Sequence, residues 1–425
     1  MCAHEIKPDL LIQEANRLYD KEKNVRGSIA LYKAAHCFKP NDISIIFQIG
    51  YRYGHLGKYE KEIAWYDKIL KDHDMIAGVY NNKAIALKQL GQYDQAEACA
   101  HQAIQLEPNS SNPYYALRDC ALVKGALDKA WEYDDYIAHC NQDNPQSGID
   151  DWSSIDFTGK RVLLYDHNGF GDLFHWIRYA KLLKERGAYV IAKLRPQIIP
   201  FMQEACDFLD EIIPLKADEP EHDYSCWICL LYRNFKTTST TIPGKTPYLF
   251  PNKKRIADWK SFFEHDTNFK IGICWTANTY YRVGSHIPYP NTRTIPLAFF
   301  EPLTKLPNVS LYSLQKINGE SDLKNCAFAE KINTIANLDH EGRFLDTAAI
   351  MHHLDLIITC DTSLAHLAGA LAIPVWTVLP YAADWRWFLD RNDSPWYPTM
   401  RLFRQKTYGD WSDPFNALLT ELENR

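Results

Sequence analysis

Two polar segments in the second half of the chain contain residue types that could carry out chemistry. The first is Gly169-Phe170-Gly171-Asp172, in which a carboxylate able to act as a general base follows a glycine-bearing turn. The second is Asp361-Thr362-Ser363, followed by His366. The N–H groups at a helix start bind anions, and His366 can add a ring N–H donor on the same side. The second segment is therefore a candidate seat for the diphosphate of a nucleotide-activated substrate.

Both segments also have structural interpretations, and the residues alone leave these open. Asp172 is either a cap of the predicted helix from 172 to 186 or a general base that faces a cleft at the carboxyl end of a strand. Asp361 can cap the predicted helix from 364 to 371, which would make this segment an ordinary strand–helix junction. Gly169-Phe170-Gly171 is a weak dinucleotide fingerprint, because it lacks a third glycine and Asp172 would repel a phosphate.

Alternating strands and helices must position these two segments. Their order predicts parallel α/β domains, and the turn-rich segment from 237 to 251 is the expected crossing between two such domains. Strands are predicted at 161–166, 189–194, 211–214, 270–275, 308–315, 354–360 and 375–379. Helices are predicted at 172–186, 196–205, 296–303, 346–353, 364–371 and 413–423.

The first 145 residues contain a repeat with a period of 34 residues, with copies that start near residues 9, 43, 77 and 111. In the third copy, Ala84 and Ala96 are small enough for paired helices to approach, and Gly91 separates the two helices. The second copy has Glu62 where a small residue is expected. This pattern resembles the tetratricopeptide repeat family. The resemblance implies a concave groove that binds a peptide or protein segment, and a structural cap or an oligomerisation surface is the alternative.

Composition excludes several classes of protein. A net charge of -6 over 425 residues gives no sign of a nucleic-acid or membrane-surface partner. We expect no signal peptide and no transmembrane segment, because no sufficiently long apolar run occurs. The 11 cysteines are an odd number of scattered residues, which favours reduced thiols in the cytoplasm. The Cys226-Trp227-Ile228-Cys229 motif lacks the second pair that a zinc site needs.

Two motifs together go beyond a generic α/β domain. Gly171-Asp172-Leu173-Phe174-His175 resembles the Gly-Asp-x-x-His start of the inverting heptosyltransferase family. The segment from Asp361 to Ala368 resembles the donor motif of the same family. With the repeats, the whole chain is similar to bacterial proteins that join tetratricopeptide repeats to a glycosyltransferase of this type. The resemblance implies a GT-B fold of two Rossmann-like domains, inversion at the anomeric carbon and no metal.

The resemblance also implies roles for individual residues. Asp172 is the expected catalytic base, and Gly169, Gly171 and His175 are expected to line the acceptor side of the cleft. Arg293 stands where the family has a lysine on the donor phosphate, in a loop that also carries Arg282 and His286. The expected donor-binding residues are Thr276, Arg293, Gln315, Asp361, Thr362, Ser363, His366, Trp385 and Arg386. Three of them are assigned from their own chemistry: Gln315 ends a predicted strand and could contact the base or ribose, Trp385 could stack on a base or sugar, and Arg386 could pair with a phosphate.

Besides Asp361, three of these donor-binding assignments have structural alternatives. Gln315 could instead be a surface amide. Trp385 and Arg386 could instead pack the junction between the two domains.

These observations divide the chain into four expected parts. They are repeats at 1–145, a linker at 146–157, a short Rossmann-like acceptor domain at 158–250 and a Rossmann-like nucleotide-sugar domain at 251–425. The expected function is metal-independent, inverting transfer of a sugar from a nucleotide-sugar donor to a protein recruited by the repeats, with no cofactor. The alternatives are a transferase for a lipopolysaccharide or other glycan precursor, and a non-catalytic scaffold that retains the fold.

Overall fold

The computed structural model describes residues 7–140, 151–166, 169–277, 292–340 and 342–425. The chain forms two compact units. One consists mainly of the helical repeats, and the other consists of the α/β part together with residues 125–131. Among the described residues, each helix is too short or too polar to cross a lipid bilayer.

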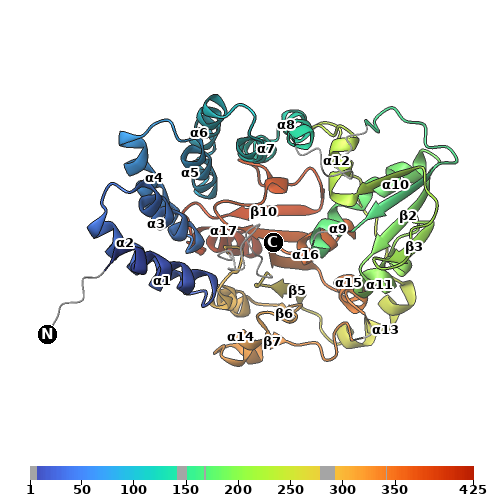
Figure 1. The fold of residues 1–425 in the computed structure, drawn as a ribbon. Helices are drawn as coiled ribbons and strands as arrows, with labels where there is room; N and C mark the ends of the chain where they lie inside the picture. Colours follow the sequence, from blue (N-terminus) through green and yellow to red (C-terminus); the bar gives the residue numbers. More distant parts are fainter. Residues whose placement is uncertain (1–6, 141–150, 167–168, 278–291, 341) are drawn as a thin grey trace. The chain divides into compact units, whose positions relative to one another are not determined.

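Consecutive helix pairs make up the N-terminal part of the chain (Figure 1, blue to teal). The first helices of the four pairs start at residues 8, 43, 77 and 112, within one residue of the predicted starts. The helices are α1 (Pro8–Asp20), α2 (Val25–Phe38), α3 (Ile43–His55), α4 (Tyr59–Asp72), α5 (Ala77–Gln89), α6 (Tyr93–Leu106), α7 (Asn112–Val123) and α8 (Leu127–Cys140).

The small residues of the repeat act as their spacing predicts. Ala84 and Ala96 are fully buried, and Gly91 follows α5 with a φ of +68°, which a residue with a side chain rarely adopts. Glu62, the expected irregularity, is only 1% exposed. Its Oε1 accepts a hydrogen bond from the Tyr66 hydroxyl at 3.1 Å. The larger side chain of Glu62 fits because residue 54 is a glycine. A Cβ atom at residue 54 would clash with Glu62.

The first α/β half contains a parallel four-stranded sheet in the order β3-β2-β1-β4. Strand β4 was not predicted, because its short run of mixed residues has no clear alternation. The strands are β1 (Arg161–Tyr165), β2 (Tyr189–Leu194), β3 (Glu211–Pro214) and β4 (Tyr224–Trp227). The helices that accompany them are α9 (Phe170–Trp176), α10 (Arg178–Glu185), α11 (Ile199–Ala205) and α12 (Leu231–Asn234).

The prediction of one continuous helix from 172 to 186 was wrong, because α9 ends at Trp176 and α10 begins at Arg178. At the break, the His175 carbonyl accepts a hydrogen bond at 2.8 Å from Nε of Arg178, a buried side chain. A side-chain donor therefore binds a carbonyl at the end of α9, where the backbone ladder is interrupted.

The second half contains a parallel six-stranded sheet in the order β10-β9-β8-β5-β6-β7. Its strands are β5 (Phe269–Cys274), β6 (Val309–Ser313), β7 (Ile332–Asn333), β8 (Leu356–Cys360), β9 (Val375–Leu379) and β10 (Met400–Arg404). The α-helices are α13 (Lys253–Phe263), α14 (Glu320–Lys324), α15 (Leu345–Met351), α16 (Ser363–Ala370) and α17 (Ser412–Glu423). Three 3₁₀ helices lie between strands in the described residues of this half: η4 (Leu297–Lys305), η5 (Ala329–Lys331) and η6 (Trp385–Trp387).

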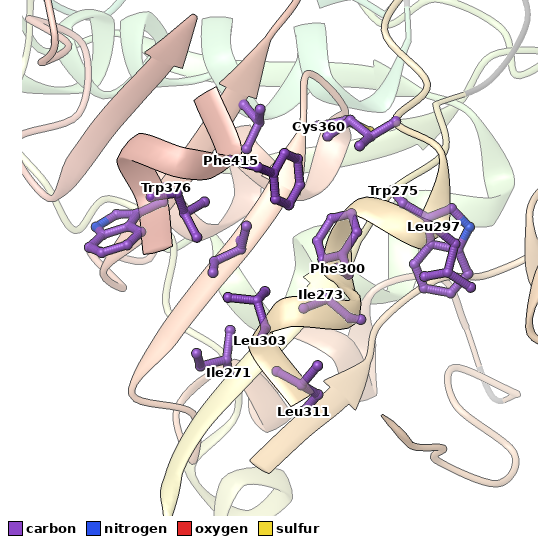
Figure 2. Packing of buried hydrophobic residues seen from close by; sticks show 14 of the residues in the cluster. Ile271, Ile273, Trp275, Leu297, Phe300, Leu303, Leu311, Cys360, Trp376 and Phe415 are labelled. Carbon is purple, nitrogen blue, oxygen red and sulfur yellow. The ribbon is translucent and has the colours of Figure 1, made fainter. Parts of the chain in front are cut away.

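A buried apolar cluster packs on one face of this sheet (Figure 2). Ile271 and Ile273 of β5 pack with Phe300 of η4 and Phe415 of α17. The segment from 296 to 303 was predicted as an α-helix, but it forms the 3₁₀ helix η4, which has Pro302 in its interior. Proline lacks the N–H that an α-helical ladder needs at that position.

The boundaries between the expected parts also differ in detail. Trp152 and Phe157, within the predicted linker, are fully buried, and their rings meet edge to face. The end of the predicted linker is therefore part of the packed α/β unit. At the crossing into the second half, the backbone N–H of Tyr248 donates to the Ala370 carbonyl at 3.0 Å. The predicted fold class, helical repeats followed by two Rossmann-like halves, is confirmed.

Candidate active site

Asp172 lies in the first turn of α9, just beyond the carboxyl end of the central strand β1. Its Oδ2 accepts a hydrogen bond at 3.0 Å from the backbone N–H of Gly169, the residue that precedes the helix. Its Oδ1 accepts from Nη2 of Arg386, which belongs to the other half. The side chain remains 28% exposed. Asp172 therefore caps its helix with one oxygen, as one interpretation predicted, and the other oxygen forms an ion pair across the junction.

The second predicted segment follows β8, whose residues are all buried. Helix α16 begins at Ser363, and Thr362 stands at its N-cap without a side-chain hydrogen bond to the helix. Asp361 was expected as a possible cap, and this was wrong. Its Oδ2 is buried and has no hydrogen-bond partner among the residues that the structure describes. The first N–H groups of α16 are thus left without a side-chain cap, and this suits a site for an anion.

The charges around α16 favour an anionic ligand. Burial raises the pKa of Asp361 to about 6, and the charge of Arg293 opposes this rise. Burial also holds the pKa of His366 well below its usual value, and Arg386 adds to the effect. His366 is therefore neutral, and Asp361 carries less negative charge near neutral pH than an exposed aspartate would. Arg293, predicted from a loose alignment, lies close enough to act on both groups. Arg282 and His286 of the same loop lie outside the described residues.

The starts of α9 and α16 lie in contact with each other. A Cβ atom on Gly171 would lie 2.9 Å from Cδ2 of His366 and 3.3 Å from the Ser363 Cα. Only glycine permits this approach without displacement of its neighbours. The structure thus brings together the two segments that the sequence singled out, although they are almost 200 residues apart in the chain.

Arg386 lies between the two segments. Its Nη1 donates to Asp384 at 3.0 Å, and its Nη2 donates to Asp172. The guanidinium lies 5.1 Å from the ring centre of Trp176 and 5.4 Å from that of Trp385. Trp385 stacks on Trp176 with ring centres 5.7 Å apart, so it packs at the junction between the halves. Trp385 and Arg386 therefore lie at the junction between the two halves, as their predicted structural alternative stated.

A buried tyrosine that the predictions missed joins the two halves. The Tyr397 hydroxyl lies 3.0 Å from Nδ1 of His175 on α9 and 3.0 Å from Nδ1 of His366 on α16. A hydroxyl donates only one hydrogen bond, so one imidazole accepts from Tyr397 and the other donates to it. His175 is fully buried, and it therefore supports the junction and does not line an open surface. Its expected place on the acceptor side of the cleft was wrong.

Gln315 does not have a free amide, because backbone groups bind both of its polar atoms. Its Oε1 accepts from the N–H groups of Trp275 and Thr276 at 3.0 and 2.9 Å, and its Nε2 donates to the Thr276 carbonyl at 3.2 Å. The alternative interpretation of Gln315 as a surface amide was wrong, since only 8% of the residue is exposed to solvent. Gln315 holds the turn after β5 in place, and Thr276 lies on that turn.

A cavity of about 270 Å³ lies at the carboxyl ends of β6 and β7. Open α/β sheets bind their ligands at this edge. The cavity was not predicted, because β7 and the loop after it have no distinctive spacing. Its lining includes Ser313, Gln315, Lys316, Thr334, Ile335 and Asn337.

Residues 77–110 match the family model of the tetratricopeptide repeat. This segment contains helices α5 and α6, the third of the N-terminal helix pairs. The chain is also 23% identical to a protein named FlbA from Caulobacter vibrioides, over 93% of this chain and 70% of that protein.

Two solved glycosyltransferase structures are similar to the chain. One is the ADP-heptose LPS heptosyltransferase II of E. coli, with a TM-score of 0.47 and 14% identity over 62% of this chain and 99% of that one. The other is a family 9 glycosyl transferase from Veillonella parvula, with a TM-score of 0.45 and 11% identity over 64% of this chain and 98% of that one.

Proposed function

We propose that the protein is a metal-independent, inverting glycosyltransferase that moves a sugar from a nucleotide-sugar donor to a protein recruited by its repeats. One observation carries the proposal. A partly exposed carboxylate, Asp172, lies beside an uncapped helix start, Ser363, and glycine at 171 allows the two to meet. A transferase of this kind needs a base for the acceptor and an anion site for the leaving group.

In the proposed reaction, Asp172 takes the proton of the acceptor hydroxyl. The acceptor oxygen forms a bond to the anomeric carbon from the face opposite the diphosphate. The bond from that carbon to the phosphate oxygen breaks, and its electron pair leaves with the diphosphate, so the configuration inverts. A positioned base contributes roughly 10²–10⁴-fold to such a rate.

The leaving diphosphate is bound by the start of α16. The backbone N–H groups of Thr362 and Ser363 and the Ser363 hydroxyl are its donors, and Arg293 and Arg386 supply positive charge. Neutral His366 adds a donor only if its Nε2 carries the proton, in which case its Nδ1 accepts from Tyr397. These groups make a metal unnecessary for charge neutralisation in the proposed mechanism.

The nucleoside of the donor occupies the cavity at the ends of β6 and β7 in this proposal. The cavity and the start of α16 both lie at the carboxyl edge of the six-stranded sheet. Nucleotides usually bind at this edge of an open α/β sheet. Gln315 lines this cavity, and its amide also fixes the turn that carries Thr276. The repeats bind the acceptor protein, as arrays of this kind commonly bind peptide segments in their groove.

A thermal-shift screen tests the proposal. The protein is heated with UDP-, GDP-, ADP-, TDP- and CMP-sugars in the presence of EDTA. We expect at least one diphosphate sugar to raise the melting temperature, because ligands that bind only the folded state stabilise it. A response to CMP-sugars alone would contradict the diphosphate seat, because these donors carry a single phosphate. Stabilisation that requires a divalent metal would contradict metal independence.

A further inference from the structure

Arg386 is bound by two carboxylates and still has an unused donor. Its side chain is 11% exposed, and Asp172 and Asp384 each accept one hydrogen bond from it. Its Nε is buried without a hydrogen-bond partner among the described residues. The backbone N–H of Arg386 also donates to Asp384 at 3.0 Å. Asp384 thus holds the backbone end of Arg386 in place. The hydrogen bond to Asp172 links Arg386 to the first α/β half.

The proposed base is therefore neutralised by a cation in this structure. A carboxylate that is ion-paired is a poorer proton acceptor than a free one, since the cation stabilises its anionic form. The same guanidinium lies within electrostatic range of Asp361 and His366 at the start of α16. The guanidinium of Arg386 can thus pair either with the proposed base, Asp172, or with an anion bound at the start of α16.

Resting on the proposed function, we propose that Arg386 is a positioning residue that couples donor binding to release of the base. Without donor, its guanidinium pairs with Asp172. A bound diphosphate attracts the guanidinium away from Asp172, because two phosphates carry more negative charge than one carboxylate. Asp172 then becomes a free base only when a donor is in place. Donor binding consequently precedes productive acceptor binding.

A double-mutant cycle tests the proposal without turnover. Binding of UDP, GDP and ADP is measured by calorimetry for the wild type, Asp172→Asn, Arg386→Gln and the double variant. Arg386→Gln should weaken binding roughly 10- to 100-fold, as expected for loss of a charged hydrogen bond. Asp172→Asn should tighten binding about threefold or more in the wild-type background, and should have no effect once Arg386 is absent. Arg386→Lys should restore part of the affinity, because it keeps the charge but not the fork.

Arg391→Gln is the matched control, because Arg391 pairs with Asp393 on the surface of the same segment, and its loss should leave nucleotide binding unchanged. An Asp172→Asn effect of equal size in both backgrounds would overturn the coupling and leave the proposed function intact. Failure of the wild type to bind any nucleoside diphosphate would overturn the proposed function and this inference with it.

Discussion

The starts of α9 and α16 are two versions of the same junction. Each follows the carboxyl end of an interior parallel strand, β1 in one half and β8 in the other. At α9, Asp172 accepts a hydrogen bond from Gly169 and places a negative charge at the helix start. At α16, Thr362 makes no side-chain cap. One side chain in the first turn thus distinguishes a potential base from a potential anion site.

Neighbouring charged groups increase the difference between the starts of α9 and α16. Near α16, Arg293 and Arg386 supply positive charge, and His366 is neutral. Near α9, Asp172 is partly exposed, and among the described residues Arg386 is the cation that pairs with it. In the proposed function, the start of α9 supplies the base and the start of α16 supplies the anion site. Four variants test whether the two helix starts have these separate roles.

Asp172→Asn should have the largest effect. Asparagine can still accept the hydrogen bond from Gly169 but cannot take a proton, so we expect kcat to fall by about 10²–10⁴-fold while nucleotide binding is retained. Initial rates of donor hydrolysis and calorimetry measure the two quantities. Asp413→Asn is the matched control, because Asp413 also lies in the first turn of a helix, α17. Unchanged turnover in Asp172→Asn would rule out its role as the base.

Ser363→Asp should come next, because it places a carboxylate in the first turn of α16, as Asp172 does in the first turn of α9. A carboxylate there is favourable for the helix but repels a diphosphate. At an effective dielectric constant of about 20, the repulsion amounts to about 3 kcal/mol, or roughly a 100-fold loss of nucleotide affinity. Ser412→Asp at the start of α17 is the control. Equal affinities in calorimetry would show that the diphosphate binds elsewhere.

Gly171→Ala tests the close approach of the two helices. The added methyl group would lie 2.9 Å from His366 and 3.3 Å from Ser363, so we expect a loss of about 1–3 kcal/mol of stability from overpacking. Gly78→Ala is the control, since a methyl group there would meet nothing within 4 Å. Urea unfolding followed by tryptophan fluorescence measures both. A Gly171→Ala variant as stable as the wild type would mean that the junction is looser than the structure indicates.

Asp361→Asn should have an effect on stability that depends on pH. Because the pKa of Asp361 is raised to about 6 in the folded protein, its contribution to stability is full below about pH 4 and is lost as the pH rises through 6. The asparagine variant lacks this loss and should gain about 1–3 kcal/mol relative to the wild type between pH 4 and 7. Melting temperatures across this range test it. A difference that does not vary with pH would contradict the burial of a titrating carboxyl group.

The repeats and the two chemical segments could be predicted because their signals are local. Spacing of 34 residues places Ala84, Ala96 and Gly91 within one helix pair, so sequence order alone determines their contacts. The strand–helix junctions at Asp172 and Asp361 likewise depend on neighbouring residues. Their mutual approach followed only from the family resemblance, because nothing in either segment encodes its distance from the other.

The remainder of the site depends on contacts between distant residues. Tyr397 stands out in the sequence only as one aromatic among several, yet its hydroxyl meets His175, 222 residues away. Gln315 was assigned to the donor because it ends a strand, but its amide is bound by the turn after β5. The interpretation of Asp361 as a cap was wrong because tertiary packing buries the side chain away from the helix N–H groups.

The configuration of the released sugar tests the central claim most directly. Wild-type protein is incubated with the α-linked nucleotide sugar that stabilises it most, in EDTA, and proton NMR identifies the first anomer formed when water acts as the acceptor. Direct displacement by a water molecule activated by Asp172 predicts the β-anomer. Initial release of the α-anomer, or release that requires a divalent metal, would contradict the account.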